Sequence, residues 1–313
     1  MKQKLAKETI SIVIPIFNEE ATIQHLVDRL RPVLDSLHEK TEVLFVDDGS
    51  LDRSFELLQK IHQRDRRFKV LQFSRNFGHQ VAISAGIDHA IGDAVVLMDG
   101  DLQDPPEVLP IFIAKWREGN HVVYAIRRKR KENIFKRTAY ALFYRALKKL
   151  SYLDIPLDSG DFCLMDRRVV DVVKTLPERN RFVRGLRTWA GFQQVGVEYE
   201  RDRRFAGDPK YTFAKLIGLA YDGLFSFSTA PLRGAVYIGF FISLCSFLGG
   251  LWVVYEKLTN AITIVGWTST IVIITFFSGI IISTLGLMAE YIRRIYEEVK
   301  HRPLYVVRKR VGI

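Results

Sequence analysis

Two long runs without a charged residue constrain the fold of this chain more than any other feature. Residues 234–255 and 258–289 contain no Asp, Glu, Lys or Arg, and no comparable run occurs earlier in the chain. A bilayer core about 30 Å thick is crossed by roughly 20 apolar helical residues. The runs are 22 and 32 residues long, so we expect two C-terminal transmembrane helices.

The alternative for these runs is a buried helical hairpin in a large soluble protein. Their length and their content of Ile, Phe, Leu and Gly disfavour that alternative. The second run is longer than one span requires, so we expect residues 259–263 in the turn or at the membrane interface. The span itself is then expected at about 265–289.

The chain is strongly basic, with a formal net charge of +11. Residues 127–149 carry ten Lys or Arg against one acid, and residues 293–313 carry seven against two. The second cluster directly follows the second uncharged run, and Arg233 precedes the first. The positive-inside rule therefore predicts that both termini are cytoplasmic. Because juxtamembrane basic segments bind acidic headgroups, we expect membrane lipids, and no nucleic acid, as the polyanionic partner.

The first half of the chain alternates between β-branched apolar segments and amphipathic ones. Strands that alternate with helices of about 10 to 15 residues predict an α/β domain with a mainly parallel sheet and helices on both faces. A composition with 48% hydrophobic and 26% charged residues excludes a disordered chain. The expected strands are 10–14, 41–46, 68–73, 94–98 and 121–125, and the expected helices are 21–37, 52–64, 79–91, 107–116 and 167–175.

Polar and acidic side chains follow four of the expected strands. Ligands of an open parallel sheet bind beyond the carboxyl ends of its strands. The chain has no GxGxxG after its first strand and no Walker lysine loop, which disfavours a dinucleotide dehydrogenase or a P-loop enzyme. The strand-end residues are Asn18 and Glu19, Asp47 and Asp48, Ser74 to Asn76, and Asp99 to Asp101.

The acidic pair after the fourth strand predicts a metal site. Asp99 and Asp101 are one residue apart, and strand alternation directs one of them toward a ligand. Mg²⁺ is commonly held by one or two carboxylates together with substrate phosphates. We therefore expect Asp99, Asp101 and the side-chain carbonyl of Gln103 to hold Mg²⁺ or Mn²⁺ beside a diphosphate. The alternative is a turn with solvated acids.

Three other features are open to two interpretations each. Asp47 and Asp48 suit either a strand-to-helix turn or hydrogen bonding to a ribose or a base. His79 either contacts a nucleotide or caps the helix that follows it. The basic segment 127–149 is more typical of a solvated or lipid-facing helix than of a binding site, so we assign only Arg127 to substrate.

Five segments, in a fixed order, resemble a known family: SIVIPIFNEE at 11–20, VDDGS at 46–50, SRNFG at 74–78, DGDLQDPP at 99–106 and SGDF at 159–162. They resemble family 2 glycosyltransferases of GT-A fold, which have a Rossmann-like catalytic domain. The resemblance is closer to the polyprenyl-phosphate glycosyltransferases, the group that contains dolichol-phosphate mannose synthase and the bacterial GtrB-type undecaprenyl-phosphate glucosyltransferases. It covers nearly the whole chain.

The resemblance implies four regions and a set of site residues. A glycosyltransferase domain spans 1–210, amphipathic interface helices 211–232, two transmembrane helices 233–290 and a basic cytoplasmic tail 291–313. Asp161 matches the acid assigned as catalytic base, and Asp99, Asp101 and Gln103 match the metal site. The residues implied to bind the nucleotide sugar are Pro15, Phe17, Glu19, Val46, Asp48, Asp99, Gly100, Asp101, Arg127, Arg204 and Lys210.

The chain departs from the family pattern at three positions. The common D-A-D has Gly100 at its centre, which we expect to loosen the loop. Cys163 stands where Arg is usual, and Pro209 where Ser or Thr is frequent. None of these differences removes a charged residue from the implied site.

The implied reaction is the inverting transfer of a sugar to polyprenyl (undecaprenyl) phosphate for cell-envelope glycosylation. UDP-glucose and UDP-N-acetylglucosamine are the expected donors. A lipid phosphate is already anionic at neutral pH and needs less help from a base than a hydroxyl would, so Asp161 either orients the acceptor or the sugar or acts as the base. The expected location is the bacterial inner membrane, as a multi-pass protein with its catalytic domain in the cytoplasm. A homo-oligomer and a downstream flippase are further expected partners.

The sequence leaves two alternatives to this function. A processive polysaccharide synthase would be expected to carry a Q-x-x-R-W segment and more spans, whereas the sequence around Arg187 and Trp189 lacks both the Gln and the spacing. A non-catalytic membrane scaffold with a nucleotide-binding fold is disfavoured by the intact acidic and basic residues of the implied site.

Overall fold

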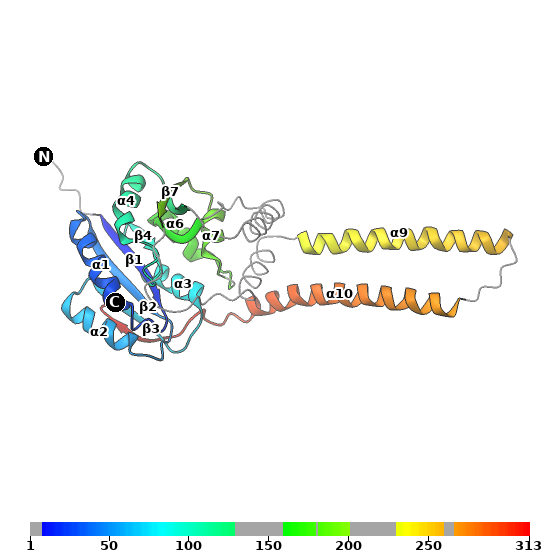
Figure 1. Cartoon of the computed structure of the whole chain (residues 1–313), viewed down its shortest axis with the longest axis horizontal. Coiled ribbons are helices and arrows are strands. Elements are labelled where there is room, and N and C mark those ends of the chain that lie inside the picture. Colours follow the sequence, from blue (N-terminus) through cyan, green and yellow to red (C-terminus); the bar gives the residue numbers. More distant parts are fainter. Residues whose placement is uncertain (1–7, 129–158, 180, 201–229, 260–265) are drawn as a thin grey trace. The chain divides into compact units, whose positions relative to one another are not determined.

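The computed structural model describes residues 8–128, 159–179, 181–200, 230–259 and 266–313. The chain divides into two compact units (Figure 1). The first contains the described residues up to 200 together with Arg302–Ile313, and the second contains the described residues from 230 to 301.

The first unit is built on one sheet, whose order within the described residues is β7-β5-β6-β4-β1-β2-β3-β8. Four of the seven strand pairs are parallel, namely β1 with β2, β1 with β4, β2 with β3, and β5 with β7. This confirms the predicted GT-A, mainly parallel sheet. The strands are β1 (Thr9–Ile16), β2 (Lys40–Asp47), β3 (Phe68–Phe73), β4 (Ala94–Leu97), β5 (Val122–Arg128), β6 (Ser159–Asp166), β7 (Gln194–Glu200) and β8 (Val307–Val311).

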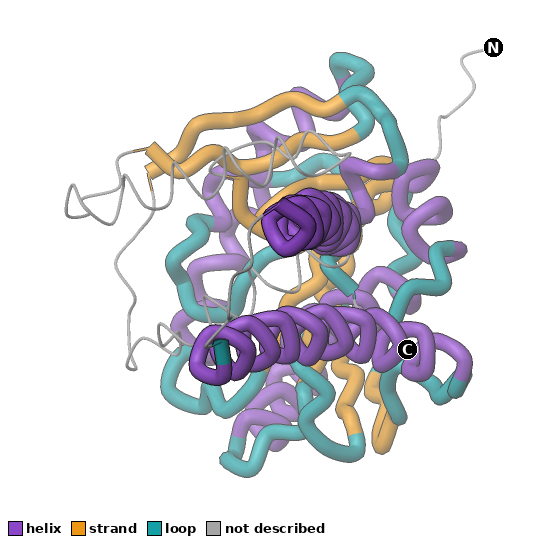
Figure 2. Tube along the Cα trace, turned by 90° about the vertical axis from the view of Figure 1, so that its right-hand side faces the viewer, coloured by secondary structure: helices purple, strands orange, loops and turns teal. Residues whose placement is uncertain are grey.

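Helices cover both faces of the sheet, as the alternating pattern predicts (Figure 2, strands in orange and helices in purple). Alternation along β1 places Ile12 and Ile14 in a cluster with α1, α2 and α4, and Val13 in a second cluster with α3, α6 and α7. The helices are α1 (Ile23–Ser36), α2 (Ser54–Arg64), α3 (His79–His89), the 3₁₀ turn η1 (Pro106–Val108), α4 (Leu109–Arg117), α6 (Arg167–Thr175) and α7 (Val183–Trp189).

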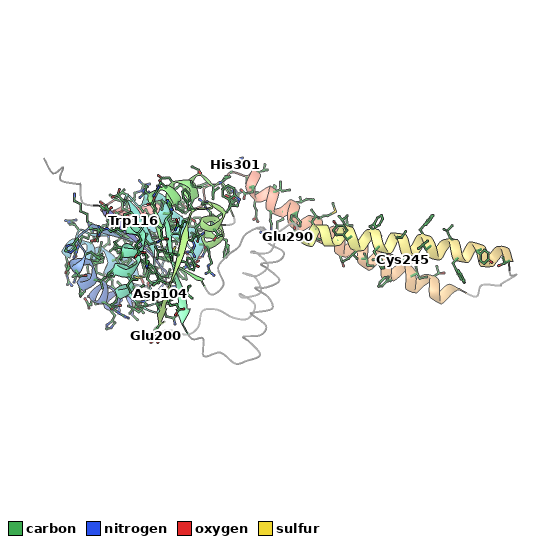
Figure 3. All side chains as sticks on the ribbon, turned by 90° about the horizontal axis from the view of Figure 1, so that it is seen from above. Asp104, Trp116, Glu200, Cys245, Glu290 and His301 are labelled. Atoms are coloured by element: carbon green, nitrogen blue, oxygen red, sulfur yellow. The ribbon has the colours of Figure 1, made fainter. Side chains whose placement is uncertain are left out.

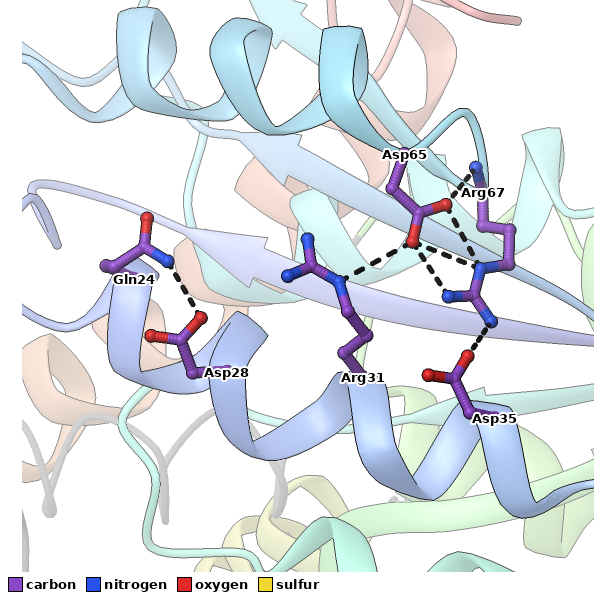
Figure 4. Close-up of polar contacts among 6 residues, drawn as sticks. All are labelled: Gln24, Asp28, Arg31, Asp35, Asp65 and Arg67. Atoms are coloured by element: carbon purple, nitrogen blue, oxygen red, sulfur yellow. Dashed lines mark hydrogen bonds and ion pairs between the residues drawn. The ribbon is translucent and has the colours of Figure 1, made fainter.

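Charged residues hold α1 against the turn between α2 and β3 (Figure 4). Arg67 bonds Asp65 at 2.8 Å within this turn and reaches Asp35 of α1 at 2.7 Å. Arg31 of α1 lies 3.6 Å from the same Asp65 carboxylate. Along the chain, all these residues are far from the residues that end β1, β2 and β4. We therefore interpret the network as structural support.

The C-terminal segment joins the sheet as β8, a strand that the sequence did not predict. Val307–Val311 pairs antiparallel with β3, and the ring of Tyr305 stacks on Phe73 at 5.1 Å between centroids. The expected basic tail at 291–313 is therefore the end of a long helix followed by an edge strand. The strand was missed because the side chains of its three central basic residues are exposed, so it has no apolar run.

The second unit contains two long helices, α9 (Ala230–Thr259) and α10 (Trp267–Val299). Large apolar side chains, including Phe240 and Trp252, are exposed along them. In the part of the chain that the structure describes, one segment, Phe276–Val299, is long and apolar enough to cross a membrane, while the apolar stretch Gly234–Gly249 of α9 is shorter. Helices thus lie where the sequence predicts two spans, and the predicted span in α9 stays a prediction. Cys245 is on α9 and Glu290 on α10 (Figure 3).

Several predicted features lie outside the described residues. They include the basic segment 129–149, and the interface helices 211–232 except for residues 230–232, which begin α9. Arg204 and Lys210, assigned to the nucleotide sugar, also lie outside them.

Candidate active site

The candidate site lies at the carboxyl ends of β1, β2 and β4, where the strand-end residues were expected. Asp161 joins them from β6, which runs antiparallel to β4. Its neighbour Cys163 pairs with Leu97, the last residue of β4, so the start of β6 lies beside the end of β4. This pairing brings Asp161 to the same edge of the sheet as Asp99, although 62 positions separate them in the sequence.

The loop after β2 is held by both of its carboxylates. Asp48 accepts main-chain hydrogen bonds from Phe77 and Gly78, at 2.6 and 2.9 Å. Burial raises the pKa of Asp48, although these two donors and His79 act against the rise. Asp47 is fully buried and accepts hydrogen bonds from the Ser50 main chain at 3.0 Å and the Gln72 side chain at 3.1 Å. Both carboxylates therefore stabilise the loops that they contact. A direct contact of Asp48 with a nucleoside stays a prediction.

A glycine at position 49 is required by this arrangement. Gly49 has a φ of 69°, and a β-carbon on it would lie 2.4 Å from the main-chain carbon of Arg75. Only glycine combines the left-handed conformation with so close an approach of two backbones. The backbone of the turn after β2 is therefore in close contact with the backbone of the loop after β3.

The loop after β1 is tied to the same turn. Asn18, with a φ of 53°, accepts a hydrogen bond from the Leu51 main chain at 2.8 Å and donates its own main-chain N–H to Ser50 at 3.0 Å. The Glu19 carboxylate accepts a hydrogen bond from the Thr22 hydroxyl at 2.9 Å, just before α1 begins. Glu19 therefore supports the start of α1, and its assigned contact with the nucleotide stays a prediction.

The other residues predicted to bind the nucleotide sugar differ in solvent exposure and in their place in the sheet. Pro15 and Val46 are register partners in β1 and β2. Val46 is fully buried in the cluster with α3, so only its main chain can face a ligand. Phe17 follows β1 and is partly exposed. Arg127 lies within β5, opposite Tyr199 of β7, and was expected beyond the end of a shorter strand.

The acidic loop after β4 concentrates negative charge. Burial raises the pKa of Asp99 to about 6, together with the charges of Asp104, Asp161 and Asp101, while His79 acts against the rise. His79 Nε2 lies 3.5 Å from Asp99 Oδ1. Asp101 accepts a hydrogen bond from the Gln103 main chain at 3.1 Å.

These residues fit a divalent cation that is also bound by a substrate. Within the described residues, no three or more His, Cys, Asp or Glu side chains are grouped closely enough to hold a metal on their own. Mg²⁺, however, is often held by one or two carboxylates with phosphate oxygens completing its shell. A bound cation would lower the repulsion between Asp99 and the neighbouring carboxylates that raise its pKa. The oxygen atoms of Asp99, Asp101 and Gln103 therefore suit a divalent cation.

Gly100, within this loop, packs closely against β1, contrary to the expectation of a loosened loop. A β-carbon there would lie 2.7 Å from the end of the Ile16 side chain and 3.2 Å from the Pro15 carbonyl oxygen. Asp104, at the exit of the loop, is buried and accepts a hydrogen bond of 2.5 Å from the Tyr199 hydroxyl. The loop is therefore fixed at both ends, to β1 and to β7.

Asp161 is surrounded by donors that sequence reasoning missed. Gln80 donates to Asp161 at 3.0 Å, and Arg184 of α7 donates to it at 3.2 Å. Burial alone would raise the pKa of this carboxyl, but the positive charges of Arg184, His79 and Arg187 outweigh it and hold the pKa well below its usual range. Asp161 is therefore an ionised, weakly basic carboxylate.

His79 connects the two acidic positions. Its Nε2 lies 3.8 Å from Asp161 Oδ2 as well as 3.5 Å from Asp99. Burial disfavours its charged form, yet Asp161 and the other nearby carboxylates raise the pKa of His79 to about 9. His79 is both the first residue of α3 and a member of the site, so the two interpretations left open by the sequence are compatible. Gln80 and Arg184 had no sequence signal beyond the need of a buried Asp161 for partners.

Comparisons with known proteins find relatives that align with nearly the whole chain. The sequence profile of Glycosyl transferase family 2 matches residues 11–173. The chain is 52% identical to the uncharacterized glycosyltransferase YkcC of Bacillus subtilis, over 97% of this chain and 94% of that protein. It is 42% identical to the SfII prophage-derived bactoprenol glucosyl transferase of Shigella flexneri, over 96% and 97% of the two chains. Among solved structures, it is similar to glucosyl-3-phosphoglycerate synthase from Mycobacterium tuberculosis, with a TM-score of 0.44 and 22% identity over 68% of this chain and 76% of that one.

Proposed function

The chain belongs to glycosyl transferase family 2 and is a hexosyltransferase, and we propose that it transfers glucose from a nucleotide sugar to polyprenyl phosphate. Relatives named bactoprenol glucosyl transferase, which align with nearly the whole chain, support both the sugar and the acceptor. Their names favour UDP-glucose over UDP-N-acetylglucosamine as the donor. UDP itself is proposed from the resemblance of the sequence motifs.

The observation that carries this proposal is the pairing of Asp161 with two basic side chains, Arg184 and His79. Its carboxylate lies between Arg184, at 3.2 Å, and His79, at 3.8 Å, and its pKa is held low. A carboxylate of such low basicity is a poor acceptor for the proton of a sugar hydroxyl. A phosphate acceptor is already anionic and needs no proton removed, so this site suits a lipid phosphate better than a hydroxyl.

The proposed reaction is a single in-line displacement that inverts the anomeric carbon. An oxygen of the acceptor phosphate forms a bond to the anomeric carbon while the bond from that carbon to the nucleotide diphosphate breaks. The electron pair of the broken bond stays with the diphosphate. Aligning the two substrates supplies much of the rate enhancement, because the reacting atoms start close together and in line.

A divalent cation, Mg²⁺ or Mn²⁺, would be held by Asp99, Asp101 and Gln103 and would stabilise the charge on the departing diphosphate. Asp48 and the loop after β1 would bind the nucleoside at the neighbouring strand ends. Arg204 and Lys210 are proposed to close over the phosphates on the strength of the resemblance alone.

The proposed location is the bacterial inner membrane, with both helices α9 and α10 spanning it and the catalytic unit in the cytoplasm. The exposed apolar surface of both helices supports a lipid environment, because such a surface is costly in water. The excess of Lys and Arg after α10 supports the cytoplasmic orientation. A lipid acceptor would then reach the catalytic unit from the cytoplasmic leaflet.

Turnover of the purified full-length protein tests this proposal. Detergent-solubilised protein is incubated with undecaprenyl phosphate and a panel of UDP- and GDP-sugars, with Mg²⁺, Mn²⁺ or a chelator. We expect metal-dependent formation of glycolipid and UDP from UDP-glucose, lost in Asp101→Ala. Glycolipid from another donor would correct the sugar, nucleotide release without glycolipid would overturn the acceptor, and no turnover with any donor would favour a scaffold.

A further inference from the structure

Arg184 presents a partly exposed side chain beside Asp161. It lies in the first turn of α7 and bonds Asp161 through one terminal nitrogen, at 3.2 Å. Its Nε is buried and has no hydrogen-bond partner among the described residues. The side chain as a whole keeps 19% of its surface exposed. A guanidinium has five N–H donors, so the contact with Asp161 leaves several of them available to an anion.

The position of Arg184 is fixed by a bridge across three elements. Gln80 of α3 donates to Asp161 of β6 at 3.0 Å and accepts a hydrogen bond of 3.0 Å from the main chain of Val183, the first residue of α7. One amide therefore sets both the carboxylate and the start of the helix that carries Arg184. The Arg184 guanidinium also lies over the Phe182 ring, at 5.7 Å. Such a preorganised cation loses little conformational entropy when it binds a ligand.

Two arginines lie near the single carboxylate of Asp161. Arg184, Arg187 and His79 all favour the ionised form of this single carboxylate. Of the two arginines, Arg187 is fully buried, with its guanidinium over the Tyr124 ring at 5.6 Å, and is not accessible to a substrate. Arg184 is therefore the arginine of this pair that can meet an anion from solvent.

Both acidic positions lie close to the same atom, His79 Nε2. Asp99, at 3.5 Å, belongs to the loop proposed to hold the metal and the donor diphosphate. Asp161, at 3.8 Å, is the carboxylate to which Arg184 donates. An anion bound at Arg184 would thus be close to the donor diphosphate and would be held by a different residue.

Resting on the function proposed above, we propose that Arg184 binds the phosphate of the polyprenyl phosphate acceptor and, with Asp161, orients its attacking oxygen. Arginine forms bidentate, charge-assisted hydrogen bonds to phosphate, which fix the orientation of the anion as well as its position. The oxygen that is left free attacks the anomeric carbon, and the electron pair of the breaking bond leaves with the nucleotide diphosphate. Asp161 keeps the guanidinium in place throughout and gains no proton.

Steady-state kinetics of the full-length protein in detergent test this role. Arg184→Gln removes the charge and nearly keeps the size, and Arg184→Lys restores the charge without the planar fork. We expect Arg184→Gln to raise the KM for polyprenyl phosphate by about tenfold or more, with the KM for the nucleotide sugar changed less than about twofold. Arg184→Lys should recover part of the acceptor affinity. A purely structural role would change both KM values or lower kcat alone.

Arg168→Gln is the matched control. Arg168 bonds Asp166 at 2.8 Å, and Asp166 ends the same strand β6 whose first residues include Asp161. The control therefore breaks an arginine–aspartate pair at the opposite end of one strand. We expect it to leave both KM values unchanged.

The outcomes separate the two proposals. If the wild-type protein makes no glycolipid from any donor, the proposed function fails. If it makes glycolipid but Arg184→Gln keeps the wild-type acceptor KM, or shifts the donor KM equally, the role of Arg184 is overturned. Should Arg184→Gln unfold, as thermal unfolding would reveal, the Arg184→Lys variant decides by the same ratio of acceptor to donor KM.

Discussion

The Tyr305 hydroxyl donates a hydrogen bond of 3.0 Å to the Asp88 carboxylate, across 217 positions of sequence. Asp88 lies near the end of α3, the helix whose first residue is His79. The main chain of Val306 accepts a further bond from Ser74, at 2.9 Å, in the loop that holds Asp48. The segment that follows α10 is therefore fastened to two elements that build the site.

Tyr305→Phe is expected to lower the stability of the catalytic unit by about 1 kcal/mol, because it removes one hydrogen bond and leaves Asp88 without that donor. The stacked ring on Phe73 would remain in this variant. Tyr305→Ala would also remove the stacking and should cost more. Thermal unfolding of the detergent-solubilised protein measures both changes. Equal melting temperatures for wild type and Tyr305→Ala would show that the C-terminal segment does not stabilise the unit.

Gly49→Ala and Gly100→Ala are expected to differ sharply. At Gly49 the φ of 69° and the Arg75 main chain at 2.4 Å leave no room for a methyl group, so we expect a loss of about 2 kcal/mol or more. At Gly100 the nearest atom is the flexible end of Ile16, which can rotate at a cost of about 1 kcal/mol. Urea or thermal unfolding, with kcat/KM measured alongside, compares the two. A larger loss in Gly100→Ala would contradict the packing described.

Asp48→Asn is expected to damage the loop after β3. The carboxylate accepts from both Phe77 and Gly78, whereas an amide offers one acceptor and must turn a donor toward the second N–H. A buried unpaired donor costs about 1 to 3 kcal/mol. We expect a lower melting temperature together with a raised KM for the nucleotide sugar. A raised KM without loss of stability would instead show that Asp48 acts mainly on the ligand.

The pH dependence of turnover should contain no step from Asp161. Its folded pKa lies below the unfolded value of about 4. The stability it contributes is therefore complete above about pH 4 and is lost only as the pH falls toward the folded pKa. Asp161→Asn should be slower than wild type between pH 5 and 8 without losing an acid limb of the rate profile, and because Asp161 raises the pKa of His79, a step that appears only in the variant is assigned to His79. A limb that disappears in the variant would instead assign Asp161 as a general base.

The positions of the strand-end residues were predictable from the sequence because these residues follow the strands directly. Parallel strands bring their carboxyl ends to one edge, so Asp48 and Asp99 could be placed together without a structure. The two long apolar helices were likewise predictable, since the absence of charge over 20 or more residues is a local property of the sequence. These features depend on local sequence and on one rule of sheet geometry.

The partners of Asp161 were decided only by the tertiary structure. Gln80 and Arg184 lie 81 and 23 positions from it, on helices that pack on one face of the sheet. Their side chains converge because β6 runs antiparallel beside β4, a pairing that no periodicity in the sequence reports. The strand β8 was hidden for a related reason, because an exposed basic strand owes its structure to pairing with β3 and not to its own hydrophobicity. Long-range pairing, which local sequence does not encode, therefore decided the charge state of the acid at the centre of the site.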